Sequence, residues 1–139
     1  MVDLKTQYKK IELEVDEAIK EVITTSNFIN GRAVKEFASD LENYLGVKHV
    51  IPCGNGTDAL QISLMAIGVG PGDEVITSAF SYIAAAEAIS LLGAKPIFVD
   101  IDPKTFNICI SSLEKKLIDA KKKGKLPKIL IPVHFAGQP

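Results

Sequence analysis

Residues 53–60, with the sequence CGNGTDAL, have the residue types and spacing of a phosphate-binding turn. A short apolar segment leads into this run, and a pattern typical of a helix leaves it from Thr57. Glycines permit the abrupt change from strand to helix. The first amides of such a helix point at one spot, where the helix dipole adds about half a positive charge. The run therefore predicts a phosphate-binding site, but these residues alone are equally typical of a plain glycine turn.

Strands and helices alternate around and after this run. Short apolar runs predict four strands, at residues 47–52, 74–77, 96–100 and 128–133. Between them, apolar residues recur at helical spacing at residues 57–67, in an alanine-rich stretch up to Leu92, and at residues 113–120. The alternation predicts an α/β fold, a three-layer sandwich with a mainly parallel sheet covered by helices on both faces.

The first 46 residues have a different organisation. Helical periodicity predicts one helix over residues 3–25 and another over residues 34–45, which Gly46 is placed to end. The loop between them is rich in turn formers but contains Phe28 and Ile29, as expected of a loop that packs onto a surface or covers a site. We therefore expect two parts, residues 1–46 with the helices and this loop, and residues 47–139 with the sheet.

Ligands of parallel α/β sheets bind at the carboxyl ends of the strands. In this chain, polar and aromatic side chains follow the predicted strands: residues 53–60, Phe80, Tyr82, Asp100, Asp102 and His134. An aromatic ring such as Tyr82 can stack there on a flat ligand, although single aromatics at strand ends more often belong to the core. The sequence Asp-x-Asp-Pro is better explained by a turn capped by Asp102 than by an acid–base pair.

The glycine run also satisfies a loose dinucleotide fingerprint, Gly54-x-Gly56-x-x-Ala59. That fingerprint expects an acidic residue about 20 positions further on, at the end of the next strand. The next predicted strand ends in Thr77 and Ser78, without a carboxylate. An NAD-binding oxidoreductase is therefore the less favoured alternative.

The composition is that of a globular protein, with 47% hydrophobic residues, 24% charged residues and a net charge of −1. This charge gives no reason to expect nucleic acid or an anionic membrane as a partner. No apolar run approaches the roughly 20 residues that span a bilayer, and the polar first ten residues are unlike a signal peptide. Cys53 and Cys109 form no Cys-x-x-Cys pair. We therefore expect reduced thiols in the cytoplasm and no metal site.

Together the motifs resemble those of the DegT/DnrJ/EryC1/StrS family, pyridoxal-phosphate-dependent sugar aminotransferases with the fold type I, or aspartate-aminotransferase-like, architecture. CGNGTDAL is similar to the phosphate cup of that family. Other similar motifs follow in the family's order: DLKTQY at residues 3–8, FING at 28–31, GVGPGDEVI at 68–76, FSYIA at 80–84, FVDID at 98–102 and PVH at 132–134. The resemblance covers nearly the whole chain, with small departures such as Ser78, where a proline is common.

The resemblance implies a site for pyridoxal phosphate. Gly56, Thr57 and Asp58 match the positions that hold the cofactor phosphate through backbone amides and a hydroxyl. Tyr82 matches the position whose aromatic ring stacks on the pyridine. The implied reaction moves an amino group, typically from glutamate, to a keto group of a nucleotide-linked sugar.

The resemblance also implies which residues lie on the substrate side of this site. Asn30 and Gly31 belong to a segment that approaches the active site, often across the interface of a homodimer. His134 is a further candidate for the substrate side of the pocket. Residues 1–46 would thus carry an active-site loop, and residues 47–139 the N-terminal part of the cofactor-binding large domain.

In this family the lysine that forms a Schiff base with the cofactor, and the aspartate that pairs with the pyridine nitrogen, lie downstream of the matched segment. Lys48, Lys95 and Lys128 stand at the beginnings of predicted strands, at the wrong end of the sheet to substitute. We therefore expect residues 1–139 to be an N-terminal part without a catalytic residue, inactive alone. The alternative is a non-catalytic fragment or interaction module that needs a partner chain, since an uncovered sheet favours association.

Overall fold

The computed structural model of the protein describes residues 2–137. Contacts along the chain divide it into two units, with the boundary between Pro52 and Cys53. The sequence pattern had suggested a boundary after Gly46, before the apolar segment rather than after it.

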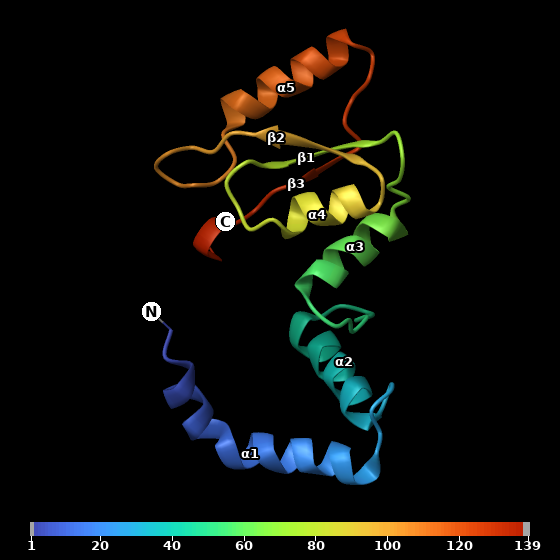
Figure 1. The fold of residues 1–139 in the computed structure, drawn as a ribbon, viewed down its shortest axis with the longest axis vertical. Helices are drawn as coiled ribbons and strands as arrows, with labels where there is room; N and C mark the ends of the chain where they lie inside the picture. The colour runs from blue at the N-terminus through green and yellow to red at the C-terminus, as the bar shows by residue number, and fades with distance from the viewer. Residues whose placement is uncertain (1, 138–139) are drawn as a thin grey trace. The chain divides into compact units, whose positions relative to one another are not determined.

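The first unit contains two helices, α1 (Leu4–Thr25) and α2 (Arg32–Leu45), as the periodicity predicts (Figure 1). Asp3 caps α1, because its carboxylate accepts hydrogen bonds from the amide and the hydroxyl of Thr6 at 3.0 and 2.7 Å. Gly46 ends α2 in the left-handed region, with φ of +66°. Neither helix buries a side chain. The apolar stripes that predicted these helices are therefore mostly exposed, with Val15, Val22, Ala38 and Leu41 half-buried.

The strand expected at residues 47–52 is wrong. This segment is irregular, and it has no partner strand among the described residues. A strand is stable only when its amides and carbonyls pair with a neighbour, which an apolar sequence alone does not guarantee. The amide of Val50 instead donates to the carboxylate of Glu42 at 3.0 Å. The sheet consequently has three strands instead of the four expected.

The second unit is an α/β sandwich, as predicted. Its sheet contains β1 (Glu74–Ser78), β2 (Lys95–Val99) and β3 (Ile129–Ile131), all parallel and in the order β2-β1-β3. Helix α4 (Ala84–Leu91) covers one face of the sheet and α5 (Ile110–Lys122) covers the other (Figure 1). Helix α3 (Gly56–Ala66) packs on α4, and a short 3-10 turn, η1 (Phe135–Gly137), follows β3. The three layers place the loops after β1, β2 and β3 at one edge.

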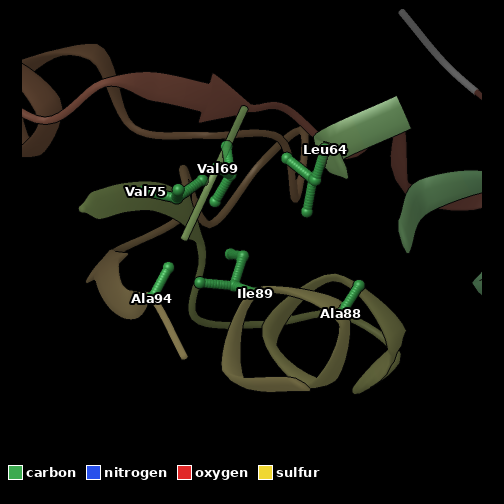
Figure 2. Close-up of a cluster of buried hydrophobic side chains, with 6 residues drawn as sticks. All are labelled: Leu64, Val69, Val75, Ala88, Ile89 and Ala94. Carbon is green, nitrogen blue, oxygen red and sulfur yellow. The ribbon is translucent and has the colours of Figure 1, made fainter. Parts of the chain in front are cut away.

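The core of this unit lies between β1 and the helices α3 and α4. Figure 2 shows its buried side chains: Leu64, Val69, Val75, Ala88, Ile89 and Ala94. Val75, Ala88 and Ile89 are completely inaccessible to solvent. Small alanines on α4 let its backbone approach the sheet closely, while Leu64 joins α3 to the same cluster. Helix α3, which begins within the glycine run, is thus fixed to α4 and the sheet by apolar packing.

The amino ends of the strands are held by charged side chains. The ammonium of Lys128 donates to the carbonyl of Gly68 at 2.5 Å and to the carboxylate of Asp73 at 3.1 Å. The Lys128 bond, together with the amide of Gly70, holds the pKa of the Asp73 carboxyl below its usual range. Lys95 pairs with Glu74 at 3.3 Å. These lysines lie at the edge opposite the loops that carry the candidate site.

No helix among the described residues is both long and apolar enough to cross a membrane.

Candidate functional site

The glycine run forms a capped helix start. Asn55 is the N-cap of α3, and its side-chain oxygen accepts a hydrogen bond from the amide of Asp58 at 3.0 Å. Its side-chain nitrogen donates to the carboxylate of Asp58 at 3.1 Å. Sequence reasoning overlooked Asn55, although an asparagine three residues before an aspartate at a helix start is a recognisable capping signal. The cap fixes the direction in which the first turn of α3 points.

Two backbone donors remain open at this helix start. Within the described part of the chain, no acceptor bonds the amides of Gly56 and Thr57. The amide of Asp58 is already taken by Asn55. Free amides at a helix N-terminus attract an anion, because the helix dipole and the N–H groups act together. Gly56 and Thr57 are therefore the donors best placed to bind a phosphate.

The two glycines of the run have different roles. A Cβ on Gly54 would lie 2.9 Å from a carboxylate oxygen of Asp58, so a side chain at this position would displace that carboxylate. A Cβ on Gly56 would meet no atom within 4 Å, and the φ of Gly56 is not positive. Neither packing nor backbone conformation therefore explains Gly56. The open space beside it fits a bound group that must approach the backbone closely.

Tyr82 does not belong to the core. Its side chain is 79% exposed, and it has no ring contact with another described residue. The exposure removes the explanation that a single aromatic at a strand end is a packing residue. The ring follows the end of β1 and is free to stack on a flat group. Phe80, two residues earlier, instead contacts Phe106 and Phe135.

The end of β1 also holds an unsatisfied polar group. Ser78 is only 4% exposed, and its hydroxyl has no hydrogen-bond partner among the described residues. The neighbouring hydroxyl of Thr77 donates to the carbonyl of Ile131 at 3.2 Å. A buried hydroxyl without a partner destabilises the fold, so such groups are usually satisfied by a ligand, by water or by further protein atoms. The strand end is therefore built to meet a polar group that this segment does not itself supply.

The aspartates after β2 form a turn, as the sequence predicts. The carboxylate of Asp102 accepts hydrogen bonds from the amides of Lys104 and Thr105 at 2.8 and 3.1 Å. These bonds hold the pKa of the Asp102 carboxyl below its usual range, because they favour the charged form. A carboxyl that is stabilised as the anion is a poor general base. The structure gives it the role of a cap.

The remaining predicted site residues are distributed over both units. His134 follows β3 and is exposed, and no hydrogen bond or ring contact joins it to Tyr82 or to the helix start in the part of the chain that is described. Asn30 has a left-handed φ of 50°, and Gly31 is the N-cap of α2. A Cβ on Gly31 would lie 2.4 Å from the carbonyl oxygen of Asn27, so the turn requires a glycine. Asn30 and Gly31 thus shape a tight loop within the first unit.

The fold and the site define a class of protein before any comparison. A parallel α/β sandwich carries open amides at a helix start and an exposed ring after a strand, which are features of enzymes that bind a phosphorylated, ring-containing cofactor. The profile of the DegT/DnrJ/EryC1/StrS aminotransferase family matches residues 9–139. The chain belongs to this family.

Two curated relatives are similar to nearly the whole chain. A pleiotropic regulatory protein of Geobacillus stearothermophilus is 47% identical over 138 residues, which cover 99% of this chain and 36% of that protein. A UDP-2-acetamido-2-deoxy-3-oxo-D-glucuronate aminotransferase of Pseudomonas aeruginosa is 47% identical over 137 residues, which again cover 99% of this chain and 36% of the relative. The chain thus spans about 36% of the length of these relatives.

Solved structures have the same fold. An aminotransferase of this family from Brucella abortus superposes with a TM-score of 0.92 at 44% identity, covering 99% of this chain and 37% of that one. The PLP form of an aminotransferase described as a sugar aminotransferase from Streptococcus pneumoniae superposes with a TM-score of 0.73 at 33% identity, covering 87% of this chain and 30% of that one. The predicted partial fold type I architecture is therefore confirmed.

Proposed function

We propose that residues 1–139 form the N-terminal part of a pyridoxal-phosphate-dependent aminotransferase that moves an amino group from glutamate to a keto group of a nucleotide-linked sugar. The observation that carries this proposal is the helix start at Gly56, where two amides have no acceptor among the described residues and a ligand can approach the backbone. Family membership and the similarity to a sugar-nucleotide aminotransferase support the reaction.

The described residues fit the cofactor. The amides of Gly56 and Thr57, with the hydroxyl of Thr57, would hold its phosphate, and the dipole of α3 would favour the negative charge. Asp58 would act mainly through its bonds to Asn55, which keep the helix start in shape. The exposed ring of Tyr82 would cover one face of the pyridine. When bound, pyridoxal phosphate supplies an electron sink, and the chain supplies binding and orientation.

We assign the Schiff-base lysine and its aspartate partner to residues outside this segment. Lys95 and Lys128 are engaged with Glu74 and Asp73 at the amino ends of the strands, away from the carboxyl-end loops. Asn30, Gly31 and His134 are proposed to face the substrate in the complete enzyme. The two free thiols, Cys53 and Cys109, agree with a reducing compartment, so we propose a cytoplasmic enzyme.

Tyr82→Ala tests the cofactor assignment. We expect the variant to bind pyridoxal phosphate about tenfold more weakly than the parent chain, because the loss of ring stacking removes roughly 1.4 kcal/mol. Tyr82→Phe keeps the ring and is expected to bind like the parent. Titration with pyridoxal phosphate, followed by the absorption spectrum of the cofactor, measures both affinities.

Inorganic phosphate serves as the control ligand for this test. Its affinity, measured by calorimetry, should be the same in all three proteins, because phosphate needs the helix start and not the ring. An equal loss of affinity for both ligands in Tyr82→Ala would show that the tyrosine does not act by binding the pyridine ring. A parent chain that binds phosphate but not pyridoxal phosphate would contradict the proposed cofactor.

A second candidate is an interaction module, and exposed apolar surface favours it. On α1, Leu13 is 80% exposed and Ile23 is 58% exposed, and neither α1 nor α2 buries a side chain. Such surfaces mark contacts with other protein. We propose that in the complete enzyme they contribute to a homodimer. Light scattering of residues 1–139 is expected to show self-association, and a strictly monomeric chain that unfolds cooperatively would contradict this role.

A further inference from the structure

Three phenylalanine rings meet at the carboxyl edge of the sheet. Phe80, Phe106 and Phe135 come from the loops after β1, β2 and β3, respectively. Their ring centroids lie 5.1 Å apart for Phe80 and Phe135, and 5.8 Å apart for each of the other two pairs. These separations, with tilted rings, are those of attractive aromatic pairs. The phenylalanine cluster, defined by these three residues, therefore joins the three loops to one another.

The cluster is not simply part of the hydrophobic core. Phe80 is 49% exposed and Phe106 is 43% exposed, so their rings lie at the surface of the unit. Phe106 also has a φ of +60°, in the left-handed region that a bulky side chain rarely adopts. A strained residue of this kind persists only where its surroundings fix it, and such residues are common near functional sites.

Hydrogen bonds fix Phe106 in this conformation. Its amide donates to the carbonyl of Asp102 at 2.8 Å, and the amide of Asp102 donates to the carbonyl of Asn107 at 2.9 Å. The side-chain oxygen of Asn107 then accepts a bond from the amide of Phe135 at 3.2 Å. The loop after β2 is thus bonded to the loop after β3, in addition to the contact between their rings.

The cluster is adjacent in sequence to two proposed site residues. Phe80 precedes Tyr82 by two positions, and Phe135 directly follows His134. Among the described residues, neither side chain has a hydrogen bond or ring contact of its own that would fix its place. The position of each therefore depends on the backbone of its loop. The contact between Phe80 and Phe135, with ring centroids 5.1 Å apart, joins these two loops.

We propose that the phenylalanine cluster is a positioning device, in which Phe106 fixes the loops carrying Tyr82 and His134 before a ligand binds. Among the described residues, no hydrogen bond or ring contact joins Phe106 to Tyr82 or His134, so it acts through Phe80 and Phe135. The proposal rests on the proposed function only in naming pyridoxal phosphate as the ligand that the ordered loops receive. The ordering of the loops is a property of the free chain and can be measured without any ligand.

Hydrogen exchange of the free chain is the first test. In Phe106→Ala, we expect the hydrogen-bonded amides of Ala79, Phe135 and Gly137 to exchange about tenfold faster than in the parent chain, because two ring contacts are lost. Exchange in α3 should not change. Phe98→Ala is the matched control, since Phe98 is 46% exposed but lies on β2 outside the cluster. It should leave the exchange of both loops at the parent rate.

Ligand affinity is the second test. Phe106→Ala should weaken the binding of pyridoxal phosphate about fivefold, because a more mobile Tyr82 stacks on the ring less often. The affinity for inorganic phosphate should not change. Phe106→Leu, which refills part of the space, should restore some of the lost affinity. If Phe106→Ala does not fold, Phe80→Leu takes its place with the same two measurements.

The outcomes separate the two proposals. Unchanged exchange in both loops of a folded Phe106 variant would overturn the positioning role. An equal loss of affinity for phosphate and for pyridoxal phosphate would also overturn the positioning role, because the substitution would then have affected the helix start at Gly56. A parent chain that does not bind pyridoxal phosphate would refute the proposed cofactor, and the exchange rates would still decide the role of the cluster.

Discussion

Gly56→Val is expected to reduce the binding of both phosphate and pyridoxal phosphate by more than about tenfold, or at least about 1.4 kcal/mol, while the chain stays folded. A branched side chain at this position would occupy the space through which a phosphate approaches the amides of Gly56 and Thr57. The fold should tolerate it, because a Cβ at Gly56 would meet no atom within 4 Å and its φ is not positive. Calorimetric titration with each ligand measures the loss, and a thermal melt confirms folding.

Gly70→Val is the matched control for this substitution. A Cβ on Gly70 likewise meets no atom within 4 Å, and its φ is not positive, but it lies in the turn before β1. It should bind both ligands like the parent chain. Parent-like phosphate affinity in a folded Gly56→Val variant would show that the phosphate-binding site lies elsewhere. Comparison with Tyr82→Ala is also informative, since that substitution should affect the ring-containing ligand alone.

Much of the second unit could be predicted because its signals are local. The helices α3, α4 and α5 and the strands β1, β2 and β3 lie close to their predicted positions, and the turn at Asp102 is explained by one carboxylate and two nearby amides. The proposed phosphate site is equally local, since the amides of Gly56 and Thr57 belong to one turn of helix. Family resemblance added the identity of the ligand, which these residues alone did not give.

The features that sequence reasoning missed depend on partners distant in the chain. Residues 47–52 are apolar enough for a strand, but pairing needs a neighbouring strand, and the described residues provide none. The phenylalanine cluster joins residues up to 55 positions apart, and nothing in the local pattern of Phe80 identifies Phe135 as its partner. The buried hydroxyl of Ser78, which has no hydrogen-bond partner in the part of the chain that is described, can be recognised only once the sheet is assembled. Periodicity describes segments, and these features depend on how segments meet.

Ile89→Ala is expected to destabilise the second unit by roughly 2–5 kcal/mol, the largest effect on folding that we expect from one substitution. Ile89 is fully buried between α4 and β1, where it packs among Leu64, Val75 and Ala88. Removing its side-chain carbons leaves a cavity that close-packed neighbours fill only in part. A chain of this size should melt roughly 10 °C lower. Thermal unfolding followed by circular dichroism measures the change.

Leu91→Ala is the control on the same helix, because Leu91 is 61% exposed, and its cost should stay within about 0.5 kcal/mol. A similar loss of stability in Ile89→Ala and Leu91→Ala would contradict the assignment of Ile89 to the core. The Ile89→Ala variant also tests the helix start at Gly56, because Leu64 fixes α3 to the cluster that contains Ile89. Well below its melting temperature, Ile89→Ala should therefore bind phosphate like the parent chain, and binding should disappear only as the unit unfolds. Loss of binding in the folded variant would mean that the helix start depends on the core packing in detail, and not merely on its presence.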